Sequence, residues 1–108
     1  MKLIIDDKRD LGADIICRTG EIGVSAAKAL FAQGILIDIL YMDHDLGEGM
    51  DGSKAVQQIL SASVRPAEIR IVSSNPVGVK RIAAVCDDHL YAVCPTDPLT
   101  YRRDWLLD

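Results

Sequence analysis

Three short, largely apolar runs, at residues 3–5, 37–42 and 69–72, pass directly into polar residues. The first of them, Leu3-Ile4-Ile5, is unbroken, as expected of a central strand that is buried on both faces of a parallel sheet. The polar residues after the three runs are Asp6-Asp7, Asp43-His44-Asp45 and Ser73-Ser74-Asn75. Because parallel strands present their carboxyl ends at one edge of a sheet, we expect these polar groups to meet there.

The segments between the apolar runs carry helix signals. One predicted helix ends at Gly34, a second begins at about Ser53, and the start of the third is marked by Asn75 as N-cap and Pro76 at the first helical position. We expect further strands at residues 14–18 and 90–94, and a short final helix within residues 96–108.

The alternation of strands with helices predicts the fold class. It indicates an α/β protein with a parallel sheet and right-handed crossovers. A chain of 108 residues suffices for one core, so we expect a single domain over residues 1–108 with a five-stranded, mostly parallel sheet. Only residues 8–13 separate the first two strands, which leaves no room for a helix between them.

Composition and charge limit the classes of partner. The net charge is −4 and no run of Lys or Arg occurs, which argues against duplex DNA as a ligand but leaves a nucleotide or an RNA end open. No signal peptide or membrane-length apolar run is present, so we expect a cytoplasmic protein without membrane contact. Cys17, Cys86 and Cys94 have no CxxC spacing and are predicted to be buried, reduced thiols.

Carboxylates at the predicted sheet edge form a candidate metal site. Asp6, Asp7, Asp43 and Asp45 would repel one another there unless a cation lies between them. Oxygen ligands favour Mg²⁺ or Mn²⁺, with Ca²⁺ as the other hard cation. Asp7 or Asp45 taken alone could equally face water, and Asp51 is expected to cap the helix that follows it.

Other polar residues at this edge are candidates for phosphate binding and proton transfer. The Ser73 hydroxyl and the helix start at Asn75 are suited to a phosphate oxygen, and Arg9 lies where it could neutralise one. Ser74 is as consistent with a turn hydroxyl. His44 could be a ligand, a general acid–base or a hydrogen-bonding group.

This layout resembles the response-regulator receiver domain over residues 2–95. The resemblance implies a flavodoxin-like strand order, 2-1-3-4-5, and Mg²⁺ bound by two early acids and Asp43, which would accept a phosphoryl group. Two features depart from the receiver pattern. Its first helix has no counterpart, and Cys94 precedes Pro95 where a receiver has the lysine that contacts the phosphoryl group.

A closer resemblance is to the cyclic-phosphate processing receiver domain, a shortened relative found in bacteria and phages. Its three motifs occur here in order, as Asp6-Asp7-Lys8-Arg9, Asp43-His44-Asp45-Leu46-Gly47 and Ser73-Ser74-Asn75-Pro76-Val77-Gly78. The resemblance implies metal-assisted attack on a phosphate of a cyclic-phosphate RNA end or nucleotide.

Our leading hypothesis is therefore a metal-dependent phosphate-processing domain; if it is an enzyme, it would be a phosphoesterase or a cyclic phosphodiesterase. Asp43 would be a metal ligand or a nucleophile, with His44 as acid–base. A non-catalytic adaptor that binds a host protein or nucleotide is the first alternative, and a divergent phospho-acceptor receiver is the second. The candidate protein contact of an adaptor is the tail, with Tyr101, Trp105, Leu106 and Leu107.

Overall fold

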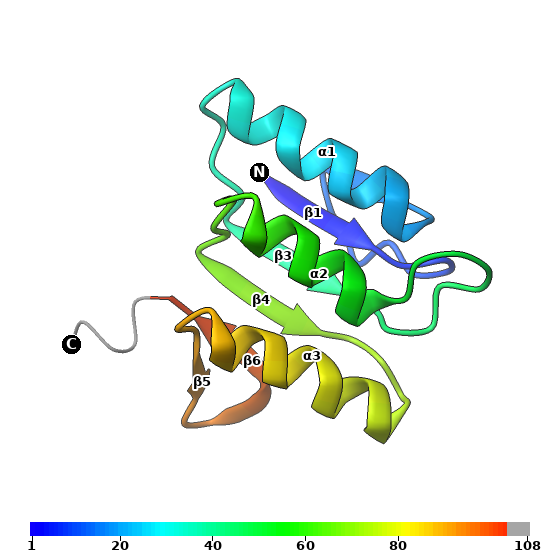
Figure 1. The fold of residues 1–108 in the computed structure, drawn as a ribbon, viewed down its shortest axis with the longest axis vertical. Helices are drawn as coiled ribbons and strands as arrows, with labels where there is room; N and C mark the ends of the chain where they lie inside the picture. Colours follow the sequence, from blue (N-terminus) through cyan, green and yellow to red (C-terminus); the bar gives the residue numbers. More distant parts are fainter. Residues whose placement is uncertain (104–108) are drawn as a thin grey trace.

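The computed structural model describes residues 1–103 and has one mixed sheet covered by helices (Figure 1). The elements in chain order are β1 (Lys2–Ile5), β2 (Ile15–Cys17), α1 (Gly20–Ala32), β3 (Ile39–Met42), α2 (Gly52–Ser61), β4 (Glu68–Ile71), α3 (Pro76–Asp88), β5 (Ala92–Cys94) and β6 (Asp97–Arg102). The predicted α/β class is confirmed, and β1 connects to β2 without a helix, as the spacing predicts.

Each helix begins at a residue whose side chain caps it. Thr19 accepts a hydrogen bond from the backbone N–H of Ile22, and Asp51 accepts one from that of Lys54. Asn75 caps α3 in the same way, with Pro76 at the first helical position, as predicted. These side chains satisfy backbone donors that have no partner within the helix.

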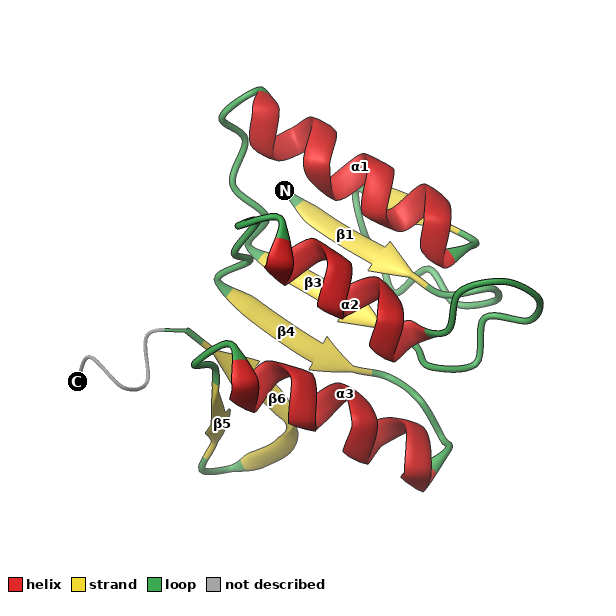
Figure 2. Cartoon of the chain, viewed as in Figure 1, coloured by secondary structure: helices red, strands yellow, loops and turns green. Residues whose placement is uncertain are grey.

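All three helices lie on the same face of the sheet and form one layer (Figure 2). The connections β2–α1–β3, β3–α2–β4 and β4–α3–β5 all advance in one direction across the sheet. Right-handed crossovers that advance in one direction place their helices on one face. The carboxyl ends of β1, β3 and β4 point the same way, toward the edge where the three helices begin (Figure 1).

The strand order is β2-β1-β3-β4-β6-β5, so the expected five-stranded order 2-1-3-4-5 is wrong at one edge. β6 is inserted between β4 and β5 and runs antiparallel to both. It comes from the tail, where we expected a short helix. A proline at residue 98 and the strand-favouring pair Thr100 and Tyr101 oppose a helix there, and pairing with the otherwise free edge of β4 satisfies the backbone.

The core lies between the sheet and the helical layer. Alternate strand residues, such as Leu40 and Met42 of β3, are fully buried against apolar helix residues, such as Val56 and Ile59 of α2. Within residues 1–103, no helix is both long and apolar enough to cross a bilayer.

Two further expectations concern cysteines and the tail. Cys17 and Cys86 are buried free thiols as predicted, but Cys94 is only half-buried because β5 is the edge strand. Tyr101 belongs to the core, which removes it from the candidate protein-contact surface. Trp105, Leu106 and Leu107 lie outside the described residues.

The place of Tyr101 predicts that β6 is required for stability. Tyr101 is 7% exposed, whereas Leu99 on the same strand is 38% exposed. Replacing Tyr101 with Ala should lower the free energy of unfolding by about 3 kcal/mol, because a large buried ring is lost. The matched Leu99→Ala change should cost less than about 1 kcal/mol. Urea denaturation measures both, and equal losses would contradict this account of the tail.

Candidate functional site

Asp6 is the first residue after β1, and all of its side chain is buried. Its Oδ1 accepts hydrogen bonds from the backbone N–H groups of Lys8 (2.9 Å) and Arg9 (3.0 Å), and its Oδ2 accepts one from Arg9 Nη1 (2.9 Å). Burial by itself raises the pKa of Asp6, but these hydrogen bonds together lower it below the usual value. Asp6 is therefore held as a carboxylate in the interior.

Asp43 holds the equivalent place after β3. Its backbone N–H donates to the carbonyl of Ile5 (3.0 Å), which continues the β1–β3 ladder. Its Oδ1 accepts from the His44 backbone N–H (2.8 Å). Burial and then the negative charge of Asp6 raise the pKa of Asp43. The fold thus holds the Asp43 carboxylate close to the negative charge of Asp6.

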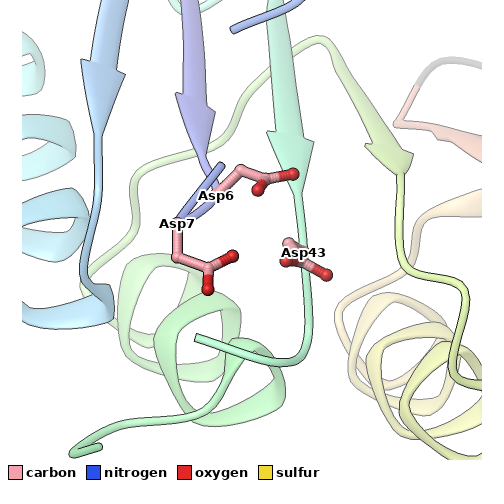
Figure 3. Close-up of side chains that lie close together, drawn as sticks. All are labelled: Asp6, Asp7 and Asp43. Carbon is pink, nitrogen blue, oxygen red and sulfur yellow. The ribbon is translucent and has the colours of Figure 1, made fainter. Parts of the chain in front are cut away.

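Asp6, Asp7 and Asp43 together form the acidic triad (Figure 3). Each offers one carboxylate oxygen, and these oxygens lie within 4.8 Å of one another. Three hard oxygen donors, two of them on buried residues, are groups that could hold a cation such as Mg²⁺ or Mn²⁺. Asp45 is not a member of this group; its side chain is 62% exposed, and its Oδ1 lies 3.3 Å from Asn75 Nδ2.

A cleft of about 460 Å³ opens beside the acidic triad. Its walls carry both signs of charge and are made by Asp7, Lys8, Arg9, Asp43, Asp45, Gly47 and Ser74. The two cations, Lys8 and Arg9, come from the loop between β1 and β2. Arg9 Nη1 also lies 3.9 Å from Asp43 Oδ2. Cys94 is not part of these walls.

Sequence reasoning missed Arg18 and Lys8. Arg18, just after β2, donates from Nη1 to the backbone carbonyls of Asp6 (3.2 Å) and Arg9 (2.8 Å). It therefore holds the loop that carries Lys8 and Arg9. Because β2 pairs with β1, a cation directly after β2 could have been expected near Asp6.

Of the three polar residues after β4, two bond the local backbone and one lines the cleft. The Ser73 hydroxyl accepts from the backbone N–H of Asn75 (3.1 Å), and it is Ser74 that contributes to the cleft walls. Asn75 Oδ1 accepts from the backbone N–H groups of Val77 (3.1 Å) and Gly78 (3.3 Å). The structure therefore brings Arg9 to the cleft directly and gives Ser73 and Asn75 structural contacts.

His44 lies behind the cleft and not on its walls. The residue is 7% exposed, and its Nδ1 lies 3.4 Å from Asp45 Oδ1. Its Nε2 is buried and has no hydrogen-bond partner among residues 1–103. The other histidine, His89, caps the end of α3.

The like charges of Asp6 and Asp43 predict a pH-dependent gain in stability for Asp43→Asn. A raised folded-state pKa means that ionised Asp43 destabilises the fold at neutral pH. In a chelator, the variant should raise the free energy of unfolding at pH 7 by about 1 kcal/mol. The gain should vanish below about pH 3, where Asp43 is protonated in both states. A variant less stable than the parent at pH 7 would contradict the assignment.

Comparison with known proteins places the chain in a family. A solved structure, a fusion of the yeast Spc42 trimeric coiled coil to another structure, shares 26% identity with a TM-score of 0.57. That match covers 78% of this chain, and this chain spans 60% of that one. No curated protein matches. The family model for the cyclic-phosphate processing receiver domain matches residues 1–88. The chain therefore belongs to the cyclic-phosphate processing receiver domain family.

Proposed function

We propose that this chain is a metal-dependent phosphate-processing domain that opens a cyclic phosphate on an RNA end or nucleotide. The observation that carries the proposal is the acidic triad beside a cleft that also presents Lys8 and Arg9. Carboxylates suit a divalent cation, and cationic side chains suit the phosphate that such a cation would share. Neither group alone would define this chemistry.

The charge distribution supports a small, phosphate-bearing ligand. The chain has a net charge of −4, and the cations at the cleft come from one short loop. This arrangement fits a single phosphate group better than a long nucleic-acid backbone. The family is named for the processing of cyclic phosphates, which supports them as the substrate class.

In the proposed reaction, water adds to phosphorus and one ring P–O bond breaks, which leaves a phosphomonoester and a free hydroxyl. A bound Mg²⁺ or Mn²⁺ would polarise a phosphoryl oxygen and lower the pKa of a water molecule. Asp6, Asp7 and Asp43 would hold this cation. Arg9, which is 42% exposed at the cleft, would neutralise the phosphate.

The proposal predicts that metal binding and turnover depend on the acidic triad. Asp7→Asn should weaken Mn²⁺ binding by at least about tenfold, because one charged ligand is lost from an exposed position. Turnover of 2′,3′-cyclic AMP with Mn²⁺ should fall in Asp7→Asn and be lost in Asp43→Asn. Calorimetry and chromatography of the product measure the two effects.

Asp10→Asn is the matched control, because Asp10 is an exposed acid of the same loop outside the cleft walls. It should leave both quantities unchanged. Equal Mn²⁺ affinity in Asp7→Asn, Asp10→Asn and the parent would exclude the acidic triad as the metal site. Mn²⁺ binding without turnover of any 2′,3′-cyclic nucleotide would overturn the proposed reaction.

Replacing Arg9 with Ala should change the affinity for metal and the affinity for phosphate in opposite directions. Its guanidinium bonds Asp6 and lies 3.9 Å from Asp43 Oδ2, so its positive charge opposes a cation at the acidic triad. Arg9→Ala should tighten Mn²⁺ binding roughly fivefold, as expected for ~1 kcal/mol between solvated charges. The same change should weaken inorganic phosphate binding in the presence of Mn²⁺.

Lys28→Ala, an exposed change on α1, controls for net charge. It should leave both affinities as in the parent. Weaker Mn²⁺ binding in Arg9→Ala would show that Arg9 supports the metal site and does not compete with it.

A further inference from the structure

The His44 ring is packed beneath the first turn of α3. A Cβ atom on Gly78 would lie 2.4 Å from His44 Cγ and 2.5 Å from Nδ1, distances that no side chain tolerates. Glycine at residue 78 therefore makes the space that the ring fills. His44 is buried, and it is not among the residues that make the cleft walls.

The backbone around His44 is equally closely packed against the start of α2. The His44 carbonyl accepts from the Gly52 backbone N–H (2.9 Å), and a Cβ on Gly52 would lie 2.7 Å from His44 Cα. His44 thus joins the starts of two helices, α2 through its backbone and α3 through its ring.

The two ring nitrogens have different surroundings. Nδ1 lies 3.4 Å from Asp45 Oδ1, and because an ionised carboxylate can only accept, Nδ1 is the donor. The same oxygen accepts from Asn75 Nδ2 (3.3 Å), and Asn75 caps α3. Nε2 approaches Asp51 Oδ2 only to 3.8 Å and makes no hydrogen bond within the described chain.

We propose that His44 is a positioning residue whose Nδ1 holds the Asp45 carboxylate and, through the Asn75 side-chain amide, the start of α3 at the wall of the cleft. The side chain of Asp45 is 62% exposed, so it needs such a partner to keep one orientation. Asp45 is a cleft residue, which links the buried ring to the phosphate site. That last link rests on the proposed function, whereas the contacts between His44, Asp45 and Asn75 do not.

Two conservative variants distinguish the role of Nδ1 from that of Nε2. In His44→Asn the side-chain amide can replace Nδ1, and in His44→Gln it can replace Nε2. We expect His44→Asn to keep the Asn75 side-chain amide resonances of the parent and its affinity for 2′,3′-cyclic AMP with Mn²⁺. His44→Gln should shift those resonances and lower the affinity by roughly tenfold, because Asp45 and the start of α3 would then have to become ordered when the nucleotide binds. Affinity for Mn²⁺ alone should not change in either variant.

His89→Gln is the matched control, because His89 lies at the other end of α3 and bonds the Val85 carbonyl (3.0 Å). It should leave the Asn75 resonances and both affinities unchanged. If either His44 variant fails to fold, Asp45→Ala tests the same contact from an exposed position. It should shift the His44 Nδ1 resonance, and an unchanged resonance would overturn the proposal.

The outcomes distinguish positioning from proton transfer. A general acid–base role requires that both His44 variants lose turnover equally while keeping their affinity, and that result would overturn the positioning role. Asn75 resonances that are unchanged in His44→Gln would overturn it as well. If the parent binds no cyclic nucleotide, the proposed function fails, and the resonances of Asn75 and His44 still decide whether the contact exists.

Discussion

The central constraint is the register of β1 and β3, which forces two carboxylates together. Ile5 pairs with Met42, so the next residues in each strand, Asp6 and Asp43, must be neighbours. Their side chains are buried at the sheet edge, where water screens their repulsion poorly. The two carboxylates have different surroundings. Asp6 accepts three hydrogen bonds, whereas the pKa of Asp43 is raised.

The short β1–β2 connection determines which cations reach these carboxylates. Because no helix separates β1 from β2, the chain turns back directly and places Lys8 and Arg9 over the strand ends. Arg18 fastens that turn to the sheet through the carbonyls of Asp6 and Arg9. In a receiver, a helix takes the place of this short connection, and a lysine after β5 supplies positive charge. Here Cys94 occupies the position of that lysine, and it lies outside the cleft walls.

Much of this arrangement can be predicted from local sequence. The rest depends on pairing between residues that are far apart in the chain. Apolar runs that end in acids predict the acidic triad, and Asn75-Pro76 predicts the start of α3. The place of β6 could not be predicted, because it depends on the free edge of β4 some thirty residues earlier. Nor does the motif reveal that His44 turns inward while Asp45 turns outward, since strand alternation ends with β3.

The most direct test of this account is a crystal structure of the protein soaked in Mn²⁺, measured at a wavelength where manganese scatters anomalously. We expect one strong anomalous peak in contact with carboxylate oxygens of Asp6, Asp7 and Asp43, with the Arg9 guanidinium moved away from Asp43. A peak elsewhere, or none at a concentration that saturates binding in solution, would contradict the claim that these strand ends form a metal site.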